Sequence, residues 1–314
     1  MVTHGRPGAT ARLTAAQFDA LYRRLASVTS WAAGERGALV ALTPGRVRAA
    51  AGEVRTGRTV TLAAPVETSP GPDSPEPARH EMRSWGEQGT AGGLQFARDS
   101  FAMNVHGDTD SHLDALCHVI YDGTLHGGVA ASSVTPAGAT ALSVDSLRDG
   151  IVGRGVLLDI PRLRGVPWLE PGDHVTAGDL VAAEEAQHVR VTEGDLLFVR
   201  VGHRRRRAEL GAWKTSDARA GLHPTALEFL AERRVCVLGS DGNNDTAPSS
   251  TEGVGFPVHV LGIHAMGLHL LDYLQFEDLA PLCAAQGRWS FLCAIAPLRL
   301  PAATGSPVNP IAVL

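Results

Sequence analysis

The 314-residue sequence has few of the features that are typical of membrane proteins, secreted proteins or nucleic-acid-binding proteins. No segment approaches the roughly 18 apolar residues that a membrane span needs, and residues 1–14 hold no apolar signal region. The formal net charge of -5 offers no excess of basic residues for nucleic acid or an anionic membrane. We therefore expect a cytoplasmic protein that acts on a small molecule, with no nucleic-acid or membrane partner.

Cysteine pairs and nucleotide-binding loops are missing as well. The four cysteines form no C-x-x-C pair and lie in apolar segments: Cys117, Cys236, Cys283 and Cys293. Such cysteines are typical of buried thiols in a reducing compartment rather than of disulfides. Neither a Walker A loop nor a G-x-G-x-x-G in a strand–helix context is present, so no nucleotide cofactor is expected.

The apolar segments that are present predict one α/β domain. Three continuous apolar runs, at residues 155–160, 196–201 and 235–239, have the length and composition of fully buried strands. Helical patterns at residues 176–185 and 223–233 alternate with them. This alternation is typical of a mixed β-sheet flanked by helices.

The domain boundaries follow from the same patterns. Residues 1–12 are expected to be disordered, and residues 13–303 to form a single domain whose first part, residues 13–57, is a helical extension. Residues 304–314 are expected to be a C-terminal tail. No internal repeat is visible.

The most informative segment is residues 104–123, which concentrates imidazoles and carboxylates. Six of them lie within thirteen residues: His106, Asp108, Asp110, His112, Asp114 and His118. These side chains are the ligands that zinc and other divalent metals accept. A strand over residues 112–114 followed by a helix would bring His112, Asp114 and His118 to one pocket. The alternative is a surface His-x-Asp pair that only hydrogen-bonds to itself.

Three later segments are also rich in polar or charged residues. Residues 240–249 follow a predicted buried strand, where α/β sheets place their sites, although a plain polar turn explains them equally well. In residues 259–272 we expect His264 to be a core residue, whereas His259 precedes a predicted helix and is better placed as a ligand. The run of residues 203–207, HRRRR, is expected to be a solvated loop, with anion binding by one arginine as the alternative.

Residues 111–118 read SHLDALCH. This segment is similar to the second half of the signature His-x-Gly-Thr-His-x-Asp-x-Pro-x-His, with Ser for Thr and Leu for Pro. By this motif the chain resembles the metal-dependent cyclase family, which includes bacterial kynurenine formamidase and isatin hydrolase. Further similar blocks are WAAGERGALVALTP, EPGD, EGDLLFVRVG, GSDGNND and GLHLLDYLQFEDL, so the resemblance covers roughly residues 30–300. It implies a partly barrel-like sheet of the swivelling β/β/α kind.

The resemblance also implies a metal centre. His112 and Asp114 match the family's metal ligands, and the first signature histidine falls at Asp108, so either Asp108 or His106 would complete the set. The family's downstream ligands are similar to His259 and Asp272, which leaves room for a second ion beside the first. The cofactor implied is Zn²⁺ or Mn²⁺.

The function implied is hydrolysis of an amide, formamide or lactam C–N bond in a small aromatic or cyclic substrate. The ion would lower the pKa of its bound water and polarise the carbonyl, and His118 would carry the proton to the leaving nitrogen. A cyclase or dehydratase of secondary metabolism and a catalytically degenerate metal-binding relative are the alternatives. The pocket walls are expected from the N-terminal helices, Trp85, Trp213 and a neighbouring subunit of a homodimer or homotetramer.

Overall fold

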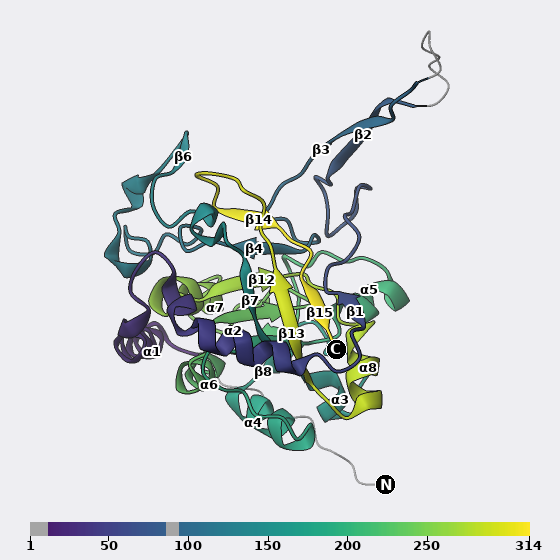
Figure 1. Ribbon diagram of the computed structural model, residues 1–314. Helices are drawn as coiled ribbons and strands as arrows, with labels where there is room; N and C mark the ends of the chain where they lie inside the picture. The colour runs from purple at the N-terminus through teal and green to yellow at the C-terminus, as the bar shows by residue number, and fades with distance from the viewer. Residues whose placement is uncertain (1–11, 86–93) are drawn as a thin grey trace.

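The structure is a computed structural model that describes residues 12–85 and 94–314. Nine strands form one sheet that curls into a half-barrel (Figure 1). From edge to edge they are β1 (Thr59–Thr61), β15 (Ile311–Val313), β13 (Ser290–Ile295), β7 (Ile151–Asp159), β9 (Leu196–Arg200), β11 (Val237–Ser240), β12 (His269–Asp272), β4 (His112–Asp114) and β14 (Gly305–Pro307). The prediction of one α/β domain with a mixed, partly barrel-like sheet is confirmed.

The centre of the sheet is parallel and both of its flanks are antiparallel. Strands β7, β9, β11 and β12 run parallel, and every residue of β9, β11 and β12 is buried. Three of these strands are the continuous apolar runs of the sequence, as expected for strands covered on both faces. The antiparallel neighbours are β13 on one side and β4 on the other.

Helices cover the sheet and connect its parallel strands. They are α1 (Ala15–Val28), α2 (Pro44–Ala50), α3 (Ile160–Arg164), α4 (Ala177–Ala186), α5 (His203–Leu210), α6 (Ala226–Arg233), α7 (Pro257–His259) and α8 (Leu279–Gln286), with a π-helical turn at Val260–Ala265. In Figure 1, α3, α4 and α6 lie below the sheet, and β4 and β14 are its uppermost strands. A capping box between Thr176 and Asp179 starts α4.

The helical extension packs on the body of the domain. Phe18, Leu21 and Leu25 repeat at helical spacing on α1, and all three are buried. Helix α1 contacts the π-helical turn, and α2 contacts β7. The extension therefore belongs to the same hydrophobic core as the sheet.

Several local expectations are corrected. Residues 304–314 are not a tail, because β14 pairs with β4 and β15 pairs with both β1 and β13. No helix follows β4: residues 115–120 are turn and irregular backbone. Residues 203–207 start helix α5 instead of forming a loop. The disorder expected for residues 1–12 falls almost entirely on residues outside the described ranges.

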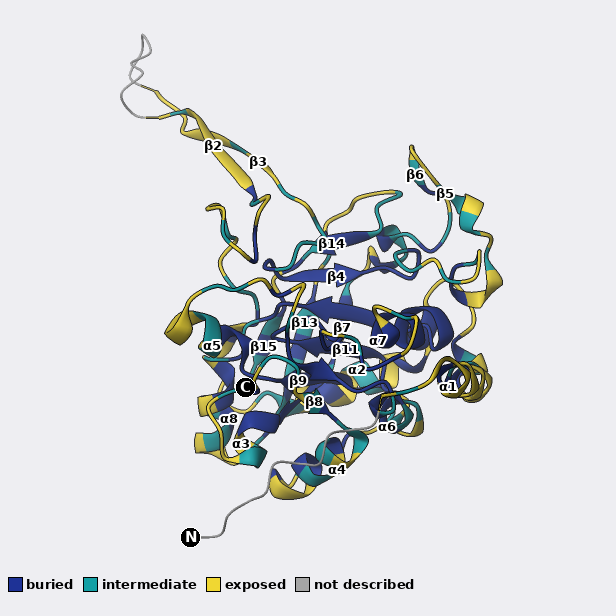
Figure 2. Cartoon of the chain, turned by 180° about the vertical axis from the view of Figure 1, so that it is seen from behind, coloured by how far each residue is buried: buried dark blue, intermediate teal, exposed yellow. Residues whose placement is uncertain are grey.

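Small sheets complete the fold. Two of them are the pairs β5 (Val134–Thr135) with β6 (Gly138–Ala139), and β8 (His174–Val175) with β10 (Gly221–Leu222). The third, β2 (Arg79–Ser84) with β3 (Arg98–Ala102), is an antiparallel hairpin that projects far from the body (Figures 1 and 2). None of the helices in residues 12–85 and 94–314 combines the length and the apolar composition that a membrane span requires.

Candidate metal site

Two adjacent strands place the central side chains of the site. In the antiparallel pairing of β4 with β12, His112 lies directly opposite Asp272, so both side chains project from the same face of the sheet. Asp114 lies two residues beyond His112 on β4 and therefore shares that face. All three residues are buried. The pairing of two short strands thus brings together residues that are 160 positions apart in sequence.

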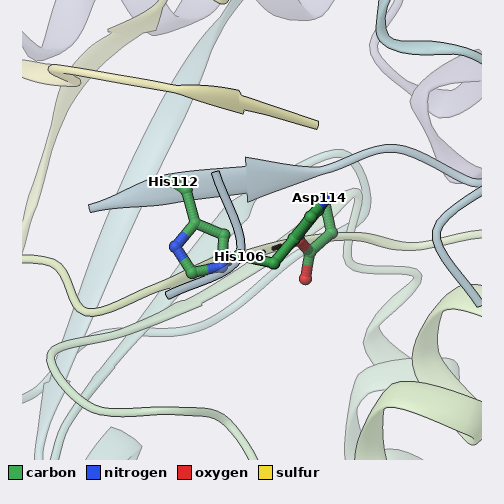
Figure 3. A group of neighbouring side chains, drawn as sticks. All are labelled: His106, His112 and Asp114. Atoms are coloured by element: carbon green, nitrogen blue, oxygen red, sulfur yellow. Dashed lines mark hydrogen bonds and ion pairs between the residues drawn. The ribbon is translucent and has the colours of Figure 1, made fainter. Parts of the chain in front are cut away.

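His106 joins His112 and Asp114 in a first cluster (Figure 3). The Nδ1 atom of His106 lies 2.8 Å from Asp114 Oδ1, and His112 Nε2 lies 3.7 Å from the same oxygen. The main-chain oxygen of Asp110 accepts a 2.7 Å hydrogen bond from His112 Nδ1. With Nδ1 bound in this way, Nε2 is the ring nitrogen of His112 that faces the cluster. The Thr304 hydroxyl lies 2.9 Å from the other nitrogen of His106.

Asp114 belongs to a second cluster as well, with His259 and Asp272. His259 Nε2 lies 3.4 Å from Asp114 Oδ2 and 3.4 Å from Asp272 Oδ2. In each cluster one ligand atom from every residue lies within 4.8 Å of the others. Asp114 is therefore the carboxylate that the two clusters share.

The polar loop after β11 supports the second cluster. His259 Nδ1 donates a 2.6 Å hydrogen bond to Asp245 Oδ2, which directs Nε2 of the ring at the cluster. The amide of Asn243 and both the amide and the backbone N–H of Asn244 donate to the Asp272 carboxylate. The sequence had marked residues 240–249 as a site loop or a polar turn. In the structure their side chains hold the candidate ligands in place.

The candidate ligands Asp114 and His259 carry opposite charges in the absence of an ion. Burial disfavours the charged form of Asp114, but His118, His106 and His259 around it hold its pKa well below the usual value. Burial likewise opposes protonation of His259, yet the Asp272, Asp114 and Asp245 carboxylates raise its pKa well above the usual value. The ion-free site is therefore a set of carboxylates partly balanced by an imidazolium.

The residues fit a divalent cation. Asp114 Oδ2 is buried and accepts no hydrogen bond from the part of the chain that the structure describes. A buried carboxylate oxygen without a donor carries a large desolvation cost; the protonated His259, at 3.4 Å, offsets part of it in the ion-free site, and a divalent cation would take over that role. Imidazole nitrogens and carboxylate oxygens are the donors that Zn²⁺ and Mn²⁺ both accept.

A cavity of about 560 Å³ lies over both clusters. Its floor includes His106, His112, Asp114, His259 and Asp272, and its walls include Asp108, His118, Val119, Ile120, Tyr121, Val254 and Phe256. Trp85 and Trp213, which were expected in the walls, are absent from this lining. Trp85 follows β2 on the projecting hairpin, and the guanidinium of Arg206 covers the ring of Trp213.

His118 lies in the cavity wall outside both clusters. Its ring stacks on that of His106, with centroids 3.8 Å apart and an angle of 12° between the planes. Burial lowers the pKa of His118 to about 4, against the opposing effect of Asp114. The imidazole is therefore neutral at pH 7 and can accept a proton.

Asp108 and His106 were alternatives for one ligand position, and the structure separates them. His106 contacts Asp114, whereas Asp108 Oδ1 accepts a 3.1 Å hydrogen bond from the Tyr273 hydroxyl and lies outside both clusters. Asp110 Oδ1 accepts a hydrogen bond from the backbone N–H of Glu67, so the Asp110 side chain stabilises the loop backbone. The contacts from Asp245 and Thr304 were not foreseen as site contacts.

Two further expectations are resolved by the contacts. His264 is a core histidine, because its ring nitrogens contact the hydroxyls of Tyr22 and Thr124. Among the arginines of α5, Arg204 is buried and donates to main-chain oxygens, and Arg207 pairs with Asp73. Both arginines therefore stabilise the fold through contacts with other groups of the protein.

Comparison with known proteins bears on what this arrangement is. The family model described as "Putative cyclase" matches residues 26–244. This chain belongs to the cyclase family. A crystal structure described as a novel cyclase is 30% identical, with a TM-score of 0.81, and the match covers 93% of this cyclase-family chain and 99% of that one. The predicted family membership is thus confirmed.

More distant relatives of this cyclase-family chain are isatin hydrolases. The isatin hydrolase of Roseibium aggregatum is 26% identical over 147 residues, which are 45% of this chain and 53% of that relative. The match therefore spans about half the length of this curated relative. Isatin hydrolase A from Ralstonia solanacearum has a TM-score of 0.58 at 24% identity, covering 81% of this chain and 91% of that one, which shows a shared fold.

Proposed function

We propose that this cyclase-family protein is a metal-dependent hydrolase that cleaves an amide, formamide or lactam C–N bond in a small aromatic or cyclic substrate. The observation that carries the proposal is the shared Asp114 between two ligand clusters, at the floor of a cavity whose wall holds a neutral histidine. The relative named isatin hydrolase supports it, because isatin is a cyclic amide.

The candidate ligands would divide between one or two ions. His106, His112 and Asp114 would hold the first, and His259 and Asp272 would hold a second together with Asp114. A divalent cation at this position supplies Lewis acidity, which polarises a carbonyl and lowers the pKa of water. The mixed nitrogen and oxygen donors suit Zn²⁺ or Mn²⁺.

His118 would move the proton that hydrolysis requires. Because its imidazole is neutral at pH 7, it can take a proton from the attacking water as the new C–O bond forms. It then returns that proton to the nitrogen as the C–N bond breaks, so the products are a carboxylic acid and an amine. Stacking on His106 keeps the imidazole beside the candidate ligands.

The cavity walls favour a flat apolar substrate. Phe256 and Ile120 line the cavity with their side chains about half exposed, at 50% and 52%. An aromatic or cyclic substrate would bury this surface, at roughly 25 cal/mol per Å² of apolar area. Asp108 is the carboxylate in the wall and can accept a hydrogen bond from a substrate N–H group.

The test combines metal analysis with turnover. The purified protein, supplied with Mn²⁺ or Zn²⁺, is assayed against a panel of formamides and lactams, and His118→Ala is compared with His188→Asn at an exposed histidine. We expect His118→Ala to keep its metal and to lose turnover by roughly 10²- to 10⁴-fold. Loss of the metal would make His118 a ligand instead, and no turnover of any amide by the wild type would refute the hydrolase proposal.

A further inference from the structure

The cavity over the candidate metal site has one carboxylate that neither ligand cluster uses. Asp108 lines this cavity but lies outside both clusters. It is partly exposed, and its Oδ1 atom accepts a 3.1 Å hydrogen bond from the Tyr273 hydroxyl. Within residues 12–85 and 94–314, Asp108 forms no ion pair with an arginine, lysine or histidine. Its other oxygen is therefore available to a ligand in the cavity.

Asp108 and Phe256 lie beside different clusters. The Tyr273 ring, whose hydroxyl holds Asp108, lies 6.4 Å from the ring of His112, a member of the first cluster. The Phe256 ring lies 5.7 Å from the ring of His259, a member of the second cluster. A ligand whose polar middle lies at the carboxylate shared by both clusters would reach Asp108 with one end and Phe256 with the other.

A smaller cavity, called the annex here, adjoins this wall. It has a volume of about 210 Å³ and shares three lining residues with the larger cavity: His106, Gly107 and Asp108. Its lining also includes Glu76 and Asp110, which are further carboxylates. The annex therefore offers room for a short substituent of a ligand whose main part occupies the larger cavity.

Neither cavity offers a basic side chain to a negatively charged substituent. No arginine or lysine is among the described residues that line them. Arg219 lies over the ring of Phe256, but it is buried and donates to main-chain oxygens. A metal would use the carboxylates of Asp114 and Asp272, whereas Asp108 would keep its charge. A carboxylate beside Asp108 would be repelled, and an ammonium group would form a charge-assisted hydrogen bond there.

We propose that the substrate is an amide that joins an apolar ring to a short aminoalkyl chain, and that Asp108 binds the ammonium group of this chain. The ring would lie against Phe256, the chain would enter the annex, and the Tyr273 hydroxyl would hold the carboxylate in position. Asp108 is thus a residue that determines specificity and touches no reacting atom. This substrate class rests on the hydrolase function proposed above.

The first test measures binding in the absence of a reaction. The wild type, loaded with Zn²⁺ or Mn²⁺, is titrated by calorimetry at pH 7 with 4-phenylbutylamine and with 4-phenylbutan-1-ol. The two compounds have the same length and no scissile bond, and the amine is protonated at this pH, as lysine is. We expect the amine to bind roughly 10- to 100-fold more tightly than the alcohol. Equal affinity for the two compounds would overturn the proposal, whether or not any variant folds.

Variants locate the preference at Asp108. Asp108→Asn keeps the shape and removes the charge, so the preference for the amine should disappear, whereas Asp108→Glu should retain part of it. The control is Asp149→Asn, which removes an exposed carboxylate of a separate cavity and should leave the preference unchanged. Circular dichroism and metal analysis verify that each variant is folded and loaded. A preference that survives in Asp108→Asn would show that the amine binds the metal or another carboxylate, and would overturn the assignment.

Turnover separates this proposal from the hydrolase proposal. N-(2-Aminoethyl)benzamide and N-(2-hydroxyethyl)benzamide differ only in the terminal group, and we expect the wild type to cleave the amine with a kcat/KM roughly 10- to 100-fold higher. Asp108→Asn should cleave both equally. Hydrolysis of both by the wild type at equal kcat/KM would refute the role of Asp108 alone. Preferred binding of the phenylbutylamine without hydrolysis of either amide would support Asp108 as an ammonium site and refute the hydrolase proposal alone.

Discussion

The contact between Asp245 and His259 offers a test that leaves every candidate ligand in place. Asp245 is completely buried and accepts three hydrogen bonds, from the backbone N–H groups of Val258 and His259 at 2.6 and 3.0 Å and from His259 Nδ1 at 2.6 Å. Asp245→Asn keeps the shape but replaces one acceptor oxygen with an N–H₂ donor. In either amide orientation, at least one of these N–H groups would face another donor.

The size of the effect follows from the role of such a contact. Replacing the carboxylate that orients a ligand histidine typically weakens metal binding 10- to 100-fold, or about 1.4 to 2.7 kcal/mol. We expect a loss of that size for Asp245→Asn when Zn²⁺ or Mn²⁺ affinity is measured by competition with a chromogenic chelator. If two ions bind, the loss should fall on the site that includes His259.

A matched control uses another buried carboxylate. Asp195 pairs with Arg154 at 2.7 Å and accepts from the backbone of Thr192, and it takes no part in either cluster. Asp195→Asn should lower the melting temperature without changing metal affinity. Equal metal affinity in Asp245→Asn and the wild type would refute the assignment of His259 as a ligand.

Three further changes have expected outcomes. A Cβ added in Gly305→Ala would lie 2.6 Å from the Leu113 backbone oxygen and 2.7 Å from His106 Cε1, so we expect β14 and His106 to shift and metal affinity to fall in the same chelator assay; unchanged affinity would contradict the assignment of His106 as a ligand. In Gly155→Ala the Cβ would lie 2.4 Å from Phe291 Cε2 in the β7–β13 pair, and overpacking should lower the free energy of unfolding in urea by about 1–3 kcal/mol, with a neutral result contradicting the packing. Burial lowers the pKa of His269 in the folded chain to about 4. Because the pKa of a histidine in the unfolded chain is near 6.5, the unfolded chain binds a proton at His269 between pH 6.5 and pH 4, whereas the folded chain does not. Stability should therefore fall by up to about 3 kcal/mol from pH 6.5 to pH 4, and His269→Gln should flatten that slope; an equal slope in the variant would refute it.

The strands at the centre of the fold were predictable from sequence because their chemistry is local. Residues 196–201 and 235–239 are continuous apolar runs, and such runs suit only strands covered on both faces. The proximity of His112 and Asp114 was likewise predictable, since two residues on one strand share a face.

Other parts of the site depend on contacts that no local pattern records. His112 meets Asp272 only because β4 pairs antiparallel with β12 in one register, and a shift by one residue would turn Asp272 away. The choice between His106 and Asp108 depends on how the loop before β4 turns, and both are compatible with its sequence.

The wrong predictions of a helix after β4 and of a tail over residues 304–314 have a similar cause. In residues 113–120 the polar side chains Asp114 and His118 lie four positions apart, a spacing that suits a helix, but β4 ends at Asp114 and the backbone turns. Residues 304–314 hold two prolines, and their apolar run, residues 311–314, is only four residues long, too short for a clear strand signal. They became strands because the exposed edges of β4 and β13 offered hydrogen-bonding partners.

Asp114 is the residue on which the account depends most directly, because both ligand clusters include it. The decisive measurement is the metal content of Asp114→Asn beside the wild type, by elemental analysis after equilibration with Zn²⁺ or Mn²⁺, with circular dichroism to verify folding. We predict that the wild type retains at least one ion per chain and that the folded variant retains none. A folded Asp114→Asn that holds as much metal as the wild type would contradict the account.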